Sequence, residues 1–190
     1  MMRKILAVMA AATICLTACA APAAPKIDTV EEKIGNLTIQ APVGWEKDVD
    51  DSYDLFTSYT YKKVENDKGI AFLTIYFSKD AKEDLSVSDF DYLFNEEHDG
   101  IDIVFNHVDD TFIGDKPVRQ GSGTWQTNYN GTVGDLYDLT RAAMYDADHK
   151  QIQVDYMYLD EKANEGYADY ADKLRDTMQL IYDYQYTTAE

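Results

Sequence analysis

Residues 70–78 constrain the fold more than any other stretch of this sequence. Successive side chains of an extended strand point to opposite faces of a sheet. One face of this segment would carry Ala71, Leu73, Ile75 and Phe77, and the other Phe72, Thr74 and Tyr76. Because both sets are largely apolar, we expect the strand to lie in the middle of a sheet and to be covered on both sides.

Further strands are predicted by alternation of apolar and polar residues. Residues 36–41 alternate in this way, and residues 55–64 are a second strand candidate. In residues 151–159 we expect Ile152, Val154, Tyr156 and Tyr158 to point inward and Gln151, Gln153 and Asp155 to point outward. Residues 101–105 and 111–113 are short and ambiguous, and the acidic residues 48–54 are expected to form a solvated loop.

Two turns predict antiparallel hairpins. The connection at residues 65–69 contains Asn, Asp and Gly, which favours a hairpin between residues 55–64 and 70–78. Asn130-Gly131 is the strongest hairpin signal in the chain and should pair residues 119–127 with residues 133–145.

Two segments have the periodicity of amphipathic helices. The first begins after Ser86, an N-cap residue with Asp89 at the capping-box position, and would continue to Gly100. The second spans residues 164–182, where the apolar positions with helical spacing are Tyr167, Tyr170, Ala171, Leu174, Met178 and Ile181. This order of elements predicts an α+β fold, in which helices pack on the faces of an antiparallel β-sheet.

The order of elements resembles that of the PsbP-like domains, which include small bacterial lipoproteins. The matching features are an opening strand that runs into Pro42-Val43-Gly44-Trp45, the strand pair 55–64 and 70–78, the helix after Leu85-Ser86, the turn at 113–118, and a meander followed by a C-terminal helix ending near Leu180-Ile181. The resemblance implies an α/β/α sandwich made by a single domain over residues 28–190. Because relatives serve as photosystem subunits, small-GTPase partners and envelope proteins, it implies no particular ligand.

The N-terminus is typical of an exported lipoprotein. Arg3 and Lys4 precede an apolar run, and Leu16-Thr17-Ala18-Cys19 resembles the bacterial lipobox, whose cysteine receives a diacylglyceryl group. We therefore expect a signal peptide over residues 1–18, a lipid on Cys19, an Ala/Pro linker over residues 19–27, and an extracytoplasmic domain anchored to the membrane. The alternative is an ordinary signal peptide that is cleaved at or beyond this site.

Charge and cysteine content exclude several functional classes. The net charge of −18 repels the phosphate backbone of nucleic acids and also anionic lipid head groups, so the lipid would hold the domain at the membrane. Cys15 and Cys19 are the only cysteines in the chain. The domain that follows them therefore has no disulfide, no zinc site with cysteine ligands and no cysteine nucleophile.

Two patterns are compatible with a divalent cation, but each has a plainer explanation. The first set of ligands would be His98, Asp99, His107, and Asp109 or Asp110. No tight ligand spacing such as HExxH occurs, and exposed histidines in acidic loops explain this set. The second is an EF-hand-like order over residues 95–106, with Gly100 at position six but Asn106 where the bidentate glutamate belongs. We expect no cofactor, and a weak calcium site of another kind remains an alternative.

The 15 tyrosines suggest an aromatic surface. Tyr59, Tyr61, Tyr156 and Tyr158 are candidates for an aromatic platform that contacts a glycan or a peptide. The alternative is that these tyrosines pack in half-buried strands, where tyrosine is common.

No catalytic constellation is recognisable. Gly121-Ser122-Gly123 lacks the G-x-S-x-G pattern of a nucleophile elbow, and its small residues favour a close backbone approach or a bulge. We therefore expect a lipid-anchored, non-catalytic binding or accessory module of the cell envelope, with an envelope protein or a glycan as its partner. The alternatives are an extracytoplasmic hydrolase that uses acidic residues in a cleft and a calcium-responsive module.

Overall fold

The computed structural model describes residues 26–82, 86–95, 99–113 and 116–180. The expected signal peptide at residues 1–18, the lipidation site Cys19 and most of the linker at residues 19–27 lie outside the described residues. His98 and Ile181 lie outside them as well.

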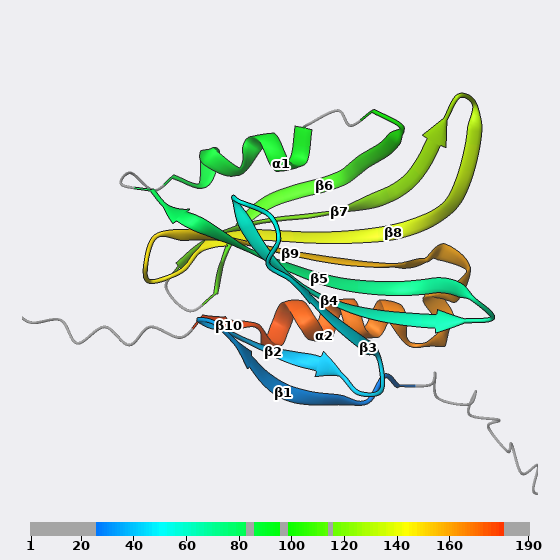
Figure 1. Cartoon of the computed structure of the whole chain (residues 1–190), viewed down its shortest axis with the longest axis horizontal. Coiled ribbons are helices and arrows are strands. Elements are labelled where there is room, and N and C mark those ends of the chain that lie inside the picture. Colours follow the sequence, from blue (N-terminus) through cyan, green and yellow to red (C-terminus); the bar gives the residue numbers. More distant parts are fainter. Residues whose placement is uncertain (1–25, 83–85, 96–98, 114–115, 181–190) are drawn as a thin grey trace, which may run out of the picture.

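Seven antiparallel strands form a large sheet in the order β3-β4-β5-β9-β8-β7-β6 (Figure 1). Their bounds are β3 Glu46–Asp50, β4 Phe56–Glu65, β5 Lys68–Ala81, β6 Ile101–Ile113, β7 Lys116–Tyr129, β8 Thr132–Tyr145 and β9 Lys150–Leu159. Strand β5 pairs with β4 on one side and β9 on the other. Its central position confirms what its two apolar faces predicted.

In the described part of the chain, a small sheet and four helices accompany the large sheet. The small sheet has the order β1-β2-β10. Its strands are β1 Thr29–Ile34, β2 Leu37–Pro42 and β10 Gln179–Leu180, and the helices are η1 Val87–Phe90, α1 Asp91–Asn95, η2 Asp160–Glu165 and α2 Tyr167–Thr177. Figure 1 shows α1 on one side of the large sheet, with α2 and the small sheet on the opposite side.

The expected α+β architecture, an antiparallel sheet with helices covering its faces, is wrong. Most of the described residues belong to β-strands of the large and the small sheet, and the small sheet shares the covering role with α2. Gly166, with a φ of 91°, delays the start of α2, and Met178 leaves the helical conformation. The chain then pairs with β2 as β10 instead of continuing as a helix toward residue 182.

Two clusters of buried apolar side chains lie on opposite faces of the large sheet. The main core fills the space between the sheet, α2 and the small sheet, and its fully buried side chains include Leu37, Ile39, Leu73, Ile75 and Tyr156. The smaller cluster lies under η1 and α1 and consists of Phe90, Phe94, Ala143 and Tyr145, with Phe105 packed against it.

Trp45 closes one margin of the main core. Its ring lies 6.1–6.4 Å from the rings of Tyr156, Tyr167 and Tyr170. Trp45 is therefore packed against the aromatic side chains of the main core.

Both predicted hairpins are present. Asn66 and Asp67 connect β4 to β5 with φ values of 51° and 63°, and Asn130 and Gly131 connect β7 to β8 with φ values of 51° and 79°. Two successive positive φ angles are the signature of the two-residue turn that matches the twist of a hairpin.

Two strands were not expected at full length. The first three residues of the acidic segment 48–54, which was predicted to be a loop, belong to β3, which pairs with β4 over Glu46–Asp50. The two ambiguous segments at 101–105 and 111–113 belong to one edge strand, β6, which has a register shift between Phe105 and His107. Charged residues and a bulge are typical of edge strands, and they obscure the alternation on which sequence-based prediction depends.

The small residues of β7 confirm the predicted close approach of the backbone to a neighbouring strand. A Cβ atom on Gly123 would overlap the backbone carbonyl oxygen of Val104 on β6, and one on Gly121 would meet the rings of Phe94 and Phe105.

We therefore expect Gly123→Ala to lower the free energy of unfolding by about 1–3 kcal/mol, because β6 must shift to accommodate the methyl group. Chemical denaturation measures the change. The matched control is Ser122→Ala, an exposed neighbour whose replacement should change stability by less than about 0.5 kcal/mol. Equal stability of Gly123→Ala and the wild-type protein would contradict the close contact.

Candidate functional site

A groove runs between helix α2 and the part of the large sheet that extends beyond it. Strands β6, β7 and β8 lie past the helix on this face, so their side chains form a floor and an outer wall. The groove has a volume of about 720 Å³, which is within the range of about 300–1,000 Å³ that is usual for ligand sites.

The floor of the groove is polar. Gln120 and Ser122 on β7 and Thr140 on β8 have the same orientation relative to the sheet, and Ser122 is directly opposite Thr140 in the strand pairing. Residues of β6, including His107, Asp109 and Thr111, form the outer wall. The floor thus offers hydroxyl and amide groups that can both donate and accept hydrogen bonds.

The inner wall is the exposed side of α2. Ala168 and Ala171 have small side chains, so the helix surface protrudes little there. The charged residues of this wall are Asp172, Arg175 and Asp176. Below them the helix is packed tightly, since the space between Leu174, Val154 and Tyr156 measures only about 10 Å³. The groove therefore ends at the apolar core.

The charges along the groove are mostly negative. Arg175 is held by two carboxylates, with Nη2 at 3.0 Å from Asp172 Oδ1 and Nε at 3.2 Å from Asp176 Oδ1. On the opposite wall, His107 Nε2 lies 3.6 Å from Asp109 Oδ1. Three carboxylates against one guanidinium favour a cationic or neutral polar ligand and disfavour an anionic one.

A pair of ionisable groups borders the groove. Burial raises the pKa of the Tyr158 hydroxyl, and the charge of Asp138 and its hydrogen bond with Tyr158 raise it further. Burial also raises the pKa of the Asp138 carboxyl, although the hydrogen bond from Tyr158 opposes the effect. Tyr158 therefore stays a neutral hydrogen-bonding group at physiological pH.

The four tyrosines predicted as an aromatic platform do not form one. Tyr61, Tyr156 and Tyr158 are only 3%, 1% and 8% exposed, and Tyr59 is half-buried with its ring edge-to-face against Phe77. They point into the main core because they lie on the face of β4 and β9 that α2 and the small sheet cover. Of the four, Tyr158 also lines the groove.

The candidate metal ligands that the structure describes, Asp99, His107, Asp109 and Asp110, do not form a metal site. Among the described residues, no group of three or more His, Cys, Asp or Glu side chains is arranged to hold a metal ion. His107 is exposed and its nearest carboxylate is that of Asp109. Residues 101–106, the second half of the proposed calcium loop, belong to strand β6.

Comparison with known proteins identifies a shared fold. No protein-family model matches the sequence, and no curated protein matches it either. LpqN of Mycobacterium tuberculosis, a protein involved in cell envelope biogenesis, aligns with a TM-score of 0.54 over 82% of this chain and 92% of its own chain, at 12% sequence identity. The chain has the fold of LpqN.

A second solved structure aligns less well. PA94 of Pseudomonas aeruginosa, a protein of unknown function described as a putative regulator, has a TM-score of 0.40 and 9% identity over 76% of this chain and 92% of its own. The similarity to LpqN, at 12% identity, establishes a common architecture. The resemblance to PsbP-like domains stays a prediction, since no family model matches. The α/β/α sandwich that it implied is wrong, because most of the described residues form β-strands.

The groove could hardly be predicted from the sequence, because its polar residues come from β6, β7, β8 and α2, which are distant from one another in the chain. The one local signal is the alternation in β7, which places the polar side chains of Gln120 and Ser122 on one face of the strand. Among the described residues, no helix is long and apolar enough to span a bilayer.

Proposed function

We propose that the protein is a lipid-anchored, non-catalytic accessory protein of the cell envelope that binds a cationic segment of a partner protein in the groove. The observation that carries the proposal is the groove itself, with its polar floor and negatively charged walls. The lipobox at Leu16–Cys19 supports the location, and so does the fold shared with LpqN, a protein involved in envelope biogenesis.

The edge of the sheet favours an extended protein segment as the ligand. Strand β6 forms the outer wall and pairs only with β7 among the described strands, so its other edge offers unpaired backbone groups. An extended segment added to β6 would gain main-chain hydrogen bonds, and every second side chain would face the groove. Lysine or arginine at these positions would meet Asp109, Asp172 and Asp176.

Peptide binding tests the proposal. Fluorescence anisotropy should show that a lysine-rich decapeptide binds the mature chain, purified in detergent, more tightly than a glutamate-rich one. We expect the double variant Asp172→Asn/Asp176→Asn to weaken binding about fivefold, because each exposed charge contributes about 0.2–1 kcal/mol. The matched control is Glu46→Gln/Asp48→Asn, which removes two exposed charges from β3, away from the groove. Equal effects of the two double variants, or no preference for the lysine peptide, would disprove the proposal.

The lipid anchor predicts a simple change of location. Cys19→Ala should move the protein from the membrane fraction to the soluble fraction, because two acyl chains on one sulfur are what anchors it stably. Cell fractionation measures the change, and mass spectrometry of the native N-terminus identifies the modification. Cys15→Ala is the control, since this cysteine lies within the expected signal peptide. A Cys19→Ala protein that stays in the membrane fraction would mean that the anchor lies elsewhere.

A further inference from the structure

A second concave surface lies on the opposite face of the large sheet from the groove. Helices η1 and α1 cover only part of this face. They cover the part where Phe90 and Phe94 pack on Ala143, Tyr145 and Phe105. Strands β4, β5 and β9 remain partly uncovered beside α1, and there the surface forms a cleft of about 400 Å³. The lining residues used below are Leu55, Phe56, Tyr76, Tyr92, Gln151 and Gln153.

One wall of the cleft consists of aromatic rings in fixed orientations. The ring of Phe56 stacks on that of Tyr53, with centroids 4.5 Å apart and planes at 19°, and meets the ring of Tyr76 edge-on at 5.5 Å. Leu55 is 68% exposed and Tyr53 is 50% exposed, so this wall offers apolar surface to solvent. The exposed faces of these rings can therefore contact a ligand.

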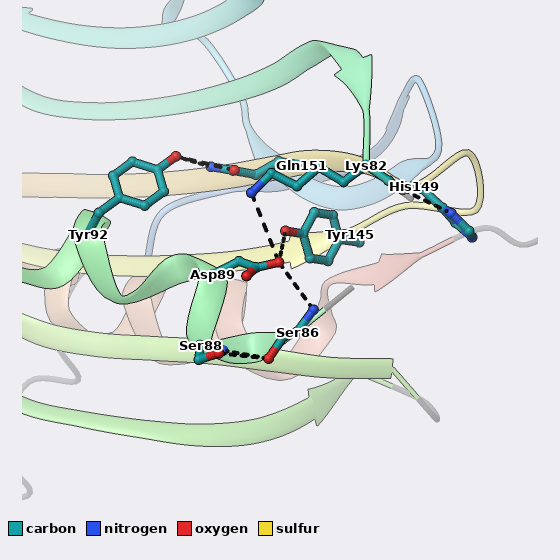
Figure 2. Close-up of polar contacts among 8 residues, drawn as sticks. All are labelled: Lys82, Ser86, Ser88, Asp89, Tyr92, Tyr145, His149 and Gln151. Atoms are coloured by element: carbon teal, nitrogen blue, oxygen red, sulfur yellow. Dashed lines mark hydrogen bonds and ion pairs between the residues drawn. The ribbon is translucent and has the colours of Figure 1, made fainter. Parts of the chain in front are cut away.

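Tyr92 on α1 forms the facing wall, and its position is well supported. Its hydroxyl and the amide of Gln151 on β9 lie 2.9–3.2 Å apart (Figure 2). The preceding turn is tied down by Asp89, whose Oδ2 accepts hydrogen bonds from the Ser86 backbone N–H and from the Tyr145 hydroxyl (Figure 2). Tyr92 is 48% exposed, so one side of its ring remains accessible.

The floor carries a second amide whose orientation is set by a buried ion pair. Gln153 Nε2 donates to Asp155 Oδ2 at 2.9 Å, and Asp155 accepts from Arg141 Nε and Nη2 at 2.8 and 2.7 Å. Arg141 and Asp155 are only 7% and 6% exposed. Because the amide nitrogen is engaged, Gln153 offers its Oε1 as an acceptor, and in the described part of the chain no group donates to it.

We propose that this cleft binds a pyranose unit of a neutral glycan. A pyranose has one face of carbon-bound hydrogens, which pack on the negative face of an aromatic ring, and a rim of hydroxyls that donate and accept hydrogen bonds. The cleft pairs these two chemistries: Phe56 and Tyr92 supply the rings, and Gln151 and Gln153 supply the amides. A few polar groups in a mainly apolar site is the usual composition of a ligand pocket.

The surroundings select against an acidic sugar. Asp80 stands at the end of the cleft, and the whole chain carries a net charge of −18. A carboxylate- or sulfate-bearing glycan would therefore be repelled. An apolar peptide side chain would fill the aromatic part of the cleft but would leave the Gln153 carbonyl without a donor, which favours the sugar.

Ligand-observed NMR on the mature chain tests the proposal. The chain is kept in a zwitterionic detergent, because a detergent with a sugar head group would compete for the cleft. The probes are three neutral trisaccharides, maltotriose, cellotriose and chitotriose, with trigalacturonate as the acidic comparison and an aromatic-rich peptide as the peptide comparison. We expect at least one neutral trisaccharide to give a saturation-transfer signal and trigalacturonate to give none.

Variants locate the binding site. Tyr92→Ala should weaken binding of the neutral sugar about three- to tenfold, and Gln153→Ala should weaken it as well, while Tyr129→Ala should not, since this exposed tyrosine lies at the distant β7–β8 hairpin. Thermal unfolding of each variant confirms that it is folded. The proposal is overturned if no neutral sugar binds, if only the peptide binds, or if Asp172→Asn/Asp176→Asn abolishes sugar binding while Tyr92→Ala does not.

Discussion

Replacing Arg141 with methionine is expected to lower the free energy of unfolding by about 3–5 kcal/mol. The guanidinium donates two hydrogen bonds to Asp155 and one to the backbone carbonyl of Leu93 in α1. Burial lowers the pKa of Arg141, but the charge and hydrogen bonds of Asp155 outweigh burial and raise it, so the guanidinium stays charged. Without the guanidinium, a carboxylate that is only 6% exposed loses its counter-charge. Urea denaturation measures the loss.

A double variant distinguishes the effect of breaking the ion pair on stability from the effect of losing side-chain volume. Arg141→Met/Asp155→Leu should recover most of the lost stability, because an apolar pair of similar size removes the buried charge altogether. Arg175→Met is the matched control: its guanidinium is also paired with carboxylates but lies on the surface, so its loss should cost at most about 1 kcal/mol. An Arg141→Met protein as stable as the Arg175→Met protein would contradict the argument.

Replacing Phe90 with alanine is expected to cost about 3–5 kcal/mol. Phe90 is fully buried, with its ring centroid 4.7 Å from that of Tyr145, and it is the principal apolar side chain of η1. Its removal leaves a cavity between the helix and β8 and loosens the segment that carries Tyr92. Chemical denaturation measures the stability, and hydrogen exchange of residues 86–95 measures the local opening.

The control for this variant is Phe112→Ala, which makes the same chemical change at a side chain that is 68% exposed on β6. Its effect should stay within about 0.5 kcal/mol, because the ring already contacts solvent. A loss in Phe90→Ala as small as that in Phe112→Ala would show that η1 and α1 contribute little to the stability of the fold, and would remove the support for a well-positioned Tyr92.

Strand β9 shows which features of burial the alternation of residues predicts and which it does not. Alternation predicted that Ile152, Val154, Tyr156 and Tyr158 point inward, and all four are buried. The same alternation predicted that Asp155 points to solvent, and it is buried instead. The periodicity states which residues share a face, but the covering of the opposite face by α1 and the pairing with Arg141 depend on residues that are distant in the sequence.

The burial of the four candidate tyrosines has the same cause, and it agrees with the alternative that they pack in the strands. The sequence contains aromatic side chains on both faces of β4 and β5, and nothing local distinguishes the covered face from the accessible one. Tyr59 and Tyr61 lie on the covered face, whereas Phe56 and Tyr76 line the open cleft. Which face remains open depends on the segments that cover it: α2 and the small sheet cover one face, whereas η1 and α1 pack on part of the other.

The sequence by itself determined the elements whose signals are local: the central strand β5, the turns at Asn66-Asp67 and Asn130-Gly131, the capping box of Ser86 and Asp89, and the close approach at Gly123. Only the tertiary structure decided the mostly β architecture, the burial of Asp155, and the positions of the groove and the cleft. The physical reason is that backbone preferences and alternation act over a few residues, whereas burial and pairing depend on which distant segments cover each face of the sheet.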